Sequence, residues 1–325
     1  MRLALAFCLF ATPVLADVET VLDDHILTGT AAFAAATQVL DDTAADHCPA
    51  ETMTGPWNAA MDAWMGIAHL RLGPGEQAAL TIAYWPDERG AGRRTLARMI
   101  ADADPMGLDA DAFSQVSVVA RGLHAMETML YDPDFNGYAA DSYACTLVSV
   151  MARDVARQAR ELDRAWREDF APLLRTAGEP DNALYLSPKE APQALFTQLH
   201  AGVEFVADQR LARPMGTAER PRPQLAENWR SGRSLRNVRL SLDALHQMAT
   251  TLAGRHVAAV DEAFDTAAYF AGSVADPAFQ DLDDPQARLR LESLEGQVRL
   301  INEVLLAEIG EPLGVRPGFN SGDGD

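Results

Sequence analysis

Apolar residues recur three and four positions apart through most of this 325-residue chain, and no segment alternates between apolar and polar residues. This pattern predicts an all-α protein, because a helix gathers such residues on one face whereas a strand requires alternation. Stretches rich in proline and glycine, such as "YWPDERGAG", separate the helical segments. We expect helices near residues 18–42, 56–72, 91–103, 111–131, 139–174, 189–211, 233–254, 255–273 and 284–309.

Two helical-bundle domains are predicted, because long helices joined by short loops are typical of bundles and the chain is long enough for two cores. The stretch "LRTAGEPDNALYLSPKEAP" interrupts the helical pattern with one glycine and three prolines. We therefore expect an N-terminal bundle over residues 17–178 and a C-terminal bundle over residues 185–325.

The first sixteen residues, "MRLALAFCLFATPVLA", predict a cleavable signal peptide. An arginine precedes a short apolar run, and small side chains occupy both positions that a signal peptidase recognises, Val14 and Ala16. The mature protein is then expected to be exported and to begin at Asp17. The run is shorter than the roughly 20 residues that cross a bilayer and no longer one follows, so no membrane span is expected. A lipid anchor on Cys8 is the alternative, although Cys8 precedes the cleavage point.

Cleavage leaves two cysteines, Cys48 and Cys145. An oxidising compartment favours a disulfide between them. Such a bond would close a loop of almost a hundred residues, which the chain-entropy treatment values at roughly 4 kcal/mol. Two buried free thiols are the alternative.

The charge balance is acidic, with 27 basic and 47 acidic residues and a formal net charge of −20. A field of that sign repels nucleic acid and anionic lipid, so neither is expected as a partner. One segment reverses the sign: residues 210–239 contain eight arginines against Glu219 and Glu227. These arginines are expected either to bind an anion or a chelated metal, or to pair with acidic residues of the other bundle.

The stretch "RGLHAMETMLYD" places His124 and Glu127 one helical turn apart on one face. An imidazole and a carboxylate so placed can bind one cation. With seven histidines and 47 acidic residues in 325, about one such pair is expected by chance, so a hydrogen-bonded surface pair is the alternative. The HExxH pattern of zinc peptidases is absent, since Ala125 occupies the place of the base.

Two other stretches of the sequence contain candidate ligands. "DPDFNG", from Asp132, matches the first half of a calcium loop, but Tyr143 occupies the position that needs a bidentate glutamate, which favours a helix-terminating turn. Trp57, Trp64 and Ile67 have the spacing of core residues, whereas His69 is either a ligand or a capping donor.

Four segments in order resemble one family. "GLHAMETML" is similar to the G-x-H-x-x-E motif of the imelysin family, also called the insulin-cleaving membrane peptidase family. "AYWPDERGAGRR" resembles the tryptophan-proline-aspartate segment that precedes this motif, and "ENWRSGRSLRN" a segment of the second half. "LGVRPGFNSGDGD" resembles the family's ending, in which Phe319 and Asn320 dock on a bundle near Asp323 and Asp325, or fray with the terminus.

The resemblance implies two helical bundles, a location in the periplasm or outer envelope, and a role in iron-regulated uptake. It also implies a site at the domain interface around Gly122, His124 and Glu127. The methionine and threonine beside Glu127, and the tyrosine and aspartate that follow, depart from the aliphatic and aromatic residues typical of the family.

Three functions therefore remain open. The first is a periplasmic protein that binds iron, zinc or another divalent metal, or chelated iron, through His124 and Glu127, with envelope iron-uptake proteins as partners. The second is a metal-dependent peptidase in which Glu127 ligates the ion or acts as the base. The third is a structural protein that docks with an envelope partner.

Overall fold

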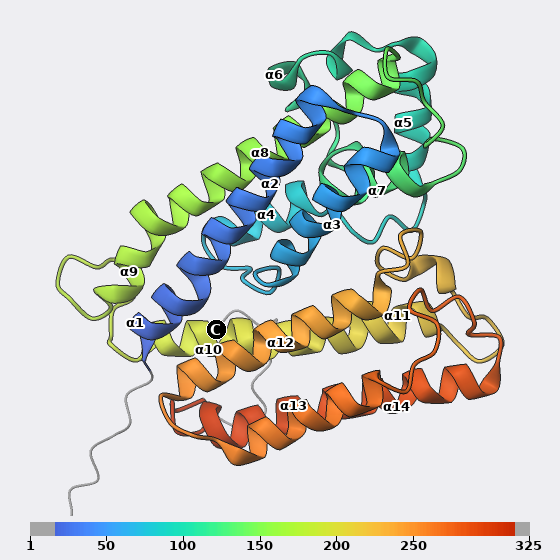
Figure 1. The fold of residues 1–325 in the computed structure, drawn as a ribbon. Coiled ribbons are helices and arrows are strands. Elements are labelled where there is room, and N and C mark those ends of the chain that lie inside the picture. The colour runs from blue at the N-terminus through green and yellow to red at the C-terminus, as the bar shows by residue number, and fades with distance from the viewer. Residues whose placement is uncertain (1–16, 316–325) are drawn as a thin grey trace, which may run out of the picture.

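The computed structural model describes residues 17–315, and in this range it consists of helices and loops with one isolated bridge between Thr217 and Arg220 (Figure 1). The prediction of an all-α protein is confirmed. The predicted signal peptide, residues 1–16, and the tail residues Phe319, Asn320, Asp323 and Asp325 lie outside the described residues.

Residues 17–315 form fourteen α-helices, which Figure 1 labels α1 to α14. Several of these helices are extended by π-helical turns, at residues 21–27, 165–170, 206–212 and 306–310. The bounds are α1 (Val18–Thr20), α2 (Thr28–Asp46), α3 (Ala50–Met65), α4 (Pro74–Ile82), α5 (Ala91–Asp102), α6 (Ala110–Phe113), α7 (Gly122–Tyr131), α8 (Tyr143–Arg164), α9 (Ala171–Arg175), α10 (Glu190–Phe205), α11 (Arg213–Met215), α12 (Ser234–Ala253), α13 (Ala258–Ala271) and α14 (Pro285–Leu305).

The helices form two groups, coloured blue to green and yellow to red in Figure 1. In the first group, α2 packs along α3 and α8, and α7 packs against α3 and α8. In the second group, α13 packs along α14, and α12 contacts α10 and α13. Contacts between α3 and α12 join the two groups. The loop between α9 and α10 contains the predicted boundary, and the division into two domains stays a prediction.

Several predicted helix bounds were wrong. A single helix over residues 111–131 does not form, because the chain leaves α6 after Phe113, makes a short 3₁₀ turn at Val118–Ala120 and starts α7 at Gly122. Helix α3 begins at Ala50, six residues earlier than expected, and accommodates Pro56 in its second turn. Helix α4 was not predicted, because it starts in a glycine- and proline-rich stretch whose composition is typical of a loop. Pro74, at the first position of α4, costs no hydrogen bond, because the amide there has no partner within the helix.

Gly122 is required where α7 begins. Its φ is +75°, a conformation in which a side chain is strained, and a Cβ there would lie 2.2 Å from the carbonyl oxygen of Ile82. The first turn of α7 therefore rests directly on the end of α4. This contact accounts for the glycine of the motif by packing alone.

Arg121 anchors the chain just before α7. Its Nε and Nη2 donate to the two carboxylate oxygens of Asp154 at 3.0 Å each, and its Nη1 donates to the carbonyl of Ser114 at 2.7 Å. Asp154, on α8, is fully buried and also accepts from Arg157 and Gln158. A bidentate pair between rigid helices fixes both the direction and the position of the α7 N-terminus.

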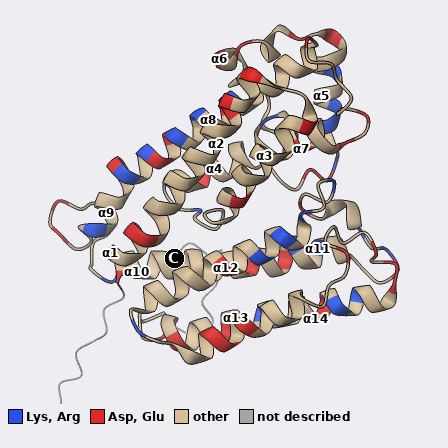
Figure 2. Cartoon of the chain, viewed as in Figure 1, with Lys and Arg blue, Asp and Glu red and all other residues tan. Residues whose placement is uncertain are grey.

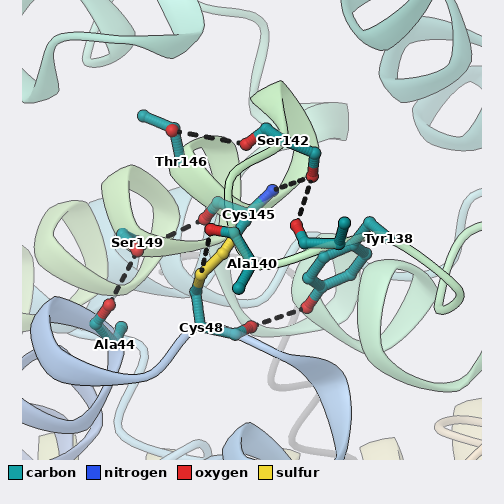
Figure 3. The surroundings of a disulfide bond; sticks show 9 residues. Ala44, Cys48, Tyr138, Ala140, Ser142, Cys145, Thr146 and Ser149 are labelled. Carbon is teal, nitrogen blue, oxygen red and sulfur yellow. Dashed lines mark hydrogen bonds between the residues drawn. A yellow bond between two sulfur atoms is a disulfide. The ribbon is translucent and has the colours of Figure 1, made fainter.

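Cys48 and Cys145 form the predicted disulfide, which joins the loop after α2 to the first turn of α8 (Figure 3). Their Cα atoms are 5.3 Å apart and 97 residues separate them in sequence. The hydroxyl of Tyr138 donates to the carbonyl of Cys48 at 2.9 Å, which ties the loop before α8 to the same point.

Basic and acidic positions are interspersed along the outer face of α8 (Figure 2). Within the described range, no helix has the length and apolarity that a membrane crossing requires.

Candidate functional site

His124 and Glu127 line a cleft of about 240 Å³ where the two helix groups meet. The first group contributes the loop before α5, with Trp85, and helix α7; the second contributes the segment before α12, with Trp229 and Arg230. The ring centroid of Trp85 lies 6.4 Å from that of His124. The two residues of the motif therefore do share one face, and this face is turned towards the second group.

His124 has one engaged and one unengaged ring nitrogen. Nδ1 lies 3.0 Å from Nδ2 of Asn228. Nε2 is buried with no hydrogen-bond partner among the described residues, and the nearest acidic oxygen, Oε1 of Glu227, is 3.7 Å away. Burial lowers the pKa of His124 below its usual value, against the opposing charges of Glu227 and Glu127, so the ring is neutral at pH 7.

A chain of amides determines which nitrogen of His124 carries the proton. The carboxylate of Glu227 can only accept, so Nδ2 of Asn237 donates to it at 3.1 Å. The same Nδ2 donates to Oδ1 of Asn228 at 2.8 Å, which turns Nδ2 of Asn228 towards His124. Nδ1 of His124 must then accept, and the neutral ring carries its proton on Nε2.

Glu127 is buried and bridges the two helix groups. Its Oε1 accepts hydrogen bonds from the backbone nitrogen of Ser231 at 2.9 Å and from the Ser231 hydroxyl at 2.7 Å. Hydrogen bonds to a carboxylate are stronger than those between neutral groups. The glutamate of the motif thus docks the segment before α12 onto α7.

Glu227 forms a buried ion pair with Arg210. Nε of Arg210 donates to Oε2 of Glu227 at 2.7 Å, and Nη1 donates to the hydroxyl of Ser241 at 3.0 Å. Burial acts to raise the pKa of Glu227, but the charge of Arg210 and the hydrogen bonds from Arg210 and Asn237 act against burial, and the pKa is lowered. Glu227 is therefore an anion held beside His124.

Four of the eight arginines of residues 210–239 pair with acidic residues of the first group, which is one of the two arrangements expected from the sequence. Arg233 and Arg236 both reach Asp62 on α3, Arg230 reaches Asp132 at 3.2 Å, and Arg213 reaches Glu88. Figure 2 shows blue segments on α12 near its end beside α11. This segment is a charged seam between the two groups.

The other predicted residues have structural surroundings. Asp132 is the C-cap of α7 and is paired with Arg93 as well as Arg230, which confirms the helix-terminating turn. Trp57, Trp64 and Ile67 are buried in the core. His69 is buried too, with its Nε2 3.0 Å from Nε2 of His25.

Direct ligation of a metal does not follow readily from this arrangement. In residues 17–315, no group of three or more His, Cys, Asp or Glu side chains is arranged to hold an ion. A ligating Nε2 must be free of its proton, which would then sit on Nδ1, facing the amide donor of Asn228. A metal bound directly by His124 therefore requires the amide chain to turn over. Ligation by His124 and Glu127 stays a prediction.

Sequence reasoning missed Glu227, Asn228 and Ser231. All three lie in "ENWRSGRSLRN", where the sequence suggested Ser231 only as a possible helix cap and Glu227 only as a counter-charge to the arginines. Asn228 has a φ of +53°, a conformation that asparagine tolerates better than most residues. Its contact with His124 joins positions 104 residues apart, and no local sequence pattern predicts a contact of that range.

Comparison with known proteins agrees with this fold. An imelysin-like protein from Psychrobacter arcticum 273-4 superimposes with a TM-score of 0.75 at 21% identity, over 94% of this chain and 100% of that one. A protein from Parabacteroides distasonis ATCC 8503, described as an iron-regulated protein A precursor, gives a TM-score of 0.71 at 12% identity, over 90% and 93%. No curated protein matches the sequence. The family model described as imelysin, Peptidase_M75, matches residues 24–304, and the chain therefore belongs to the imelysin family.

Proposed function

We propose that this protein takes part in iron uptake by binding an iron chelate in the cleft around His124, with the imidazole donating a hydrogen bond to a chelate oxygen. The observation that carries the proposal is the buried Nε2 of His124, which has no partner in the described residues and carries the ring proton. A buried donor without an acceptor costs about 1–3 kcal/mol, which a ligand oxygen would recover.

The charges of the cleft favour an uncharged ligand. Asp87 accepts from the backbone nitrogens at the start of α5, and Glu88 pairs with Arg213. Arg93 and Arg230 share Asp132. Because each of these groups already has an ionic or a hydrogen-bond partner, a neutral chelate rich in oxygen acceptors, such as a ferric tris-hydroxamate, suits the cleft better than a bare ion. Trp85 and Trp229 add apolar walls for its organic part.

Calorimetric titration tests this proposal with ferric tris(acetohydroxamate), ferrous ion and zinc ion as separate probes. The ferric complex is expected to bind saturably, and His124→Ala should weaken it by up to about tenfold, the value of one hydrogen bond. His256→Ala is the matched control, because His256 is an exposed histidine whose side chain is 79% accessible. Equal binding by His124→Ala and wild type would refute the role of the histidine.

Asn228→Asp separates chelate binding from direct ligation. Aspartate keeps the shape and tolerates the positive φ, but it accepts where asparagine donates. The ring proton then moves to Nδ1 and Nε2 gains a free lone pair, as in histidines that ligate metals. The variant should lose affinity for the ferric complex and gain affinity for zinc. Zinc binding by the wild type with no binding of the complex would instead support ligation by His124.

The hydrolytic alternative has less support in the geometry. A metallopeptidase needs a carboxylate base beside the attacking water, and one oxygen of Glu127, Oε1, already accepts two hydrogen bonds from Ser231. Position 125, where HExxH has its base, is alanine.

Export to the periplasm and contact with envelope iron-uptake proteins belong to the same proposal. The neighbour from Parabacteroides distasonis is described as a precursor, and the first sixteen residues have the signal-peptide pattern. Mass spectrometry of protein recovered from the periplasm should give a chain that begins at Asp17. A chain that retains Met1 would contradict export by cleavage.

A further inference from the structure

A second cavity, of about 280 Å³, lies between the segment after α3 and helices α10 and α12. Its lining comes from both helix groups: His69, Arg71, Gln198, Arg210 and Ser241 are basic or neutral polar residues, Glu204 and Asp208 are acidic, and Phe205 forms one wall. It is distinct from the cleft around His124, which has other lining residues.

Two guanidinium groups each lie against the Phe205 ring that lines this cavity. The Cζ atoms of Arg71 and Arg210 lie 4.2 Å and 5.0 Å from the ring centroid. Arg210 is paired with Glu227, but its Nη2 contacts only the thioether sulfur of Met65, a weak acceptor, at 3.4 Å. Arg71 forms no ion pair within the described part of the chain, and the charge of Glu227 acts on it favourably from outside ion-pair distance. The neighbouring acidic residue Asp208 is already paired with Arg299 at 2.6 Å.

The pKa of Arg71 is consistent with this crowding of like charges. Burial lowers it, and the charge of Arg210 lowers it further. An anion between the two guanidinium groups would relieve the repulsion and supply the missing acceptor.

His69 adds a requirement of the opposite kind. Oε1 of Gln247 accepts from Nδ1 of His25 at 3.4 Å, so Nε2 of His25 is the acceptor of its own ring. Nε2 of His69, 3.0 Å away, must then donate to it. The other nitrogen of His69, Nδ1, is left as an acceptor, is buried, and has no partner among the described residues. It can accept a hydrogen bond from a hydroxyl group but cannot donate to an oxyanion.

We infer that this cavity binds a small hydroxycarboxylate, whose carboxylate pairs with Arg71 and Arg210 and whose hydroxyl donates to Nδ1 of His69. The carbon skeleton of such a ligand lies against the apolar part of the wall, formed by Ala68, Ala201 and Leu245. This apolar lining favours an organic acid over inorganic phosphate.

Calorimetry with malate, succinate and inorganic phosphate as probes tests the inference on the mature chain. Malate should bind saturably and about tenfold more tightly than succinate, which has the same two carboxylates but no hydroxyl. Phosphate should bind more weakly than malate. Equal affinity for malate and succinate, preference for phosphate, or no saturable binding of malate would each overturn the assignment.

Variants locate the ligand. Arg71→Gln should weaken malate binding by about tenfold or more, because a hydrogen bond to a charged group is lost. Arg98→Gln removes the same charge from an exposed position on α5 and should bind malate like the wild type. His124→Ala should also retain malate binding. Loss of malate binding in His124→Ala with retention in Arg71→Gln would place the ligand in the other cleft and refute the inference, whatever the outcome for the ferric complex.

Discussion

Replacement of Asp154 by alanine should destabilise the protein more than any loss of a surface ion pair. Asp154 has no exposed surface, and Arg121 is 7% exposed. The substitution removes both hydrogen bonds that Asp154 accepts from Arg121 and leaves this arginine with only the carbonyl of Ser114. The guanidinium stays charged, so the variant contains a buried cation without a counter-ion.

The expected loss follows from this geometry. Breaking a buried ion pair on one side costs about 3–5 kcal/mol, because the remaining charge has lost its partner and cannot return to water. With a urea dependence of about 3 kcal/mol/M, this lowers the unfolding midpoint by about 1–1.7 M. By contrast, Glu161→Ala on the same helix removes a carboxylate that pairs with Arg157 four residues earlier. The side chain of Glu161 is 55% exposed. That control should cost less than about 1 kcal/mol.

Urea unfolding of four proteins measures the pair itself: the wild type, Asp154→Ala, Arg121→Met and the variant with both changes. The double variant should be more stable than the sum of the single losses predicts, by several kcal/mol, because neither charge is then left alone. A loss below about 1 kcal/mol in Asp154→Ala, or strict additivity in the double variant, would refute the account of Arg121 as an anchored buried cation.

Three further predictions concern stability. Gly122→Ala should destabilise by more than about 2 kcal/mol in urea unfolding, because positive φ and a blocked Cβ act together, whereas Gly137→Ala, with no atom within 4 Å of its added Cβ, should be near neutral. Reduction of the Cys48–Cys145 bond should cost about 4 kcal/mol, and an unchanged melting curve after complete reduction would contradict this. Burial lowers the pKa of His25 from 6.5 to about 4, so the unfolded chain binds the proton first as the pH falls. Stability from this source is therefore complete above pH 6.5 and falls by on the order of 3 kcal/mol towards pH 4, a slope that His25→Asn should reduce.

Apolar periodicity predicted the helix class and most long helices, because these residues face a shared core and little else determines their conformation. It failed between residues 111 and 131, where Val119 lies outside the core although its spacing fits. The helix is interrupted there because Gly122 lies close to the carbonyl of Ile82, and apolar periodicity gives no information on such a contact. A contact between distant segments overrode the local pattern.

The site was predictable only in part, for the same reason. His124 and Glu127 share a helix face, and spacing along one helix is visible in the sequence. Their partners Asn228 and Ser231 come from a loop about a hundred residues later, and their contribution depends on hydrogen-bond direction rather than residue type. If an acceptor faced Nδ1 of His124, Nε2 would be free of its proton and could ligate a metal. Because Asn228 donates to Nδ1, Nε2 carries the proton and is a donor. The residue types alone do not distinguish these two states.

The segment from Glu227 to Ser231 links the docking of the two helix groups to the chemistry of the cleft. Ser231 fastens this segment to Glu127 of α7, and Asn228, three residues earlier, sets the proton of His124. Glu227 begins the amide chain that orients Asn228, and it is itself held by Arg210, which also lines the second cavity. A ligand that contacts both groups therefore binds more tightly when the groups are docked. By reciprocity, the bound ligand stabilises the docked state by the same free energy. The glutamate of the motif therefore positions its partner loop, and in the proposed function the histidine contacts the ligand.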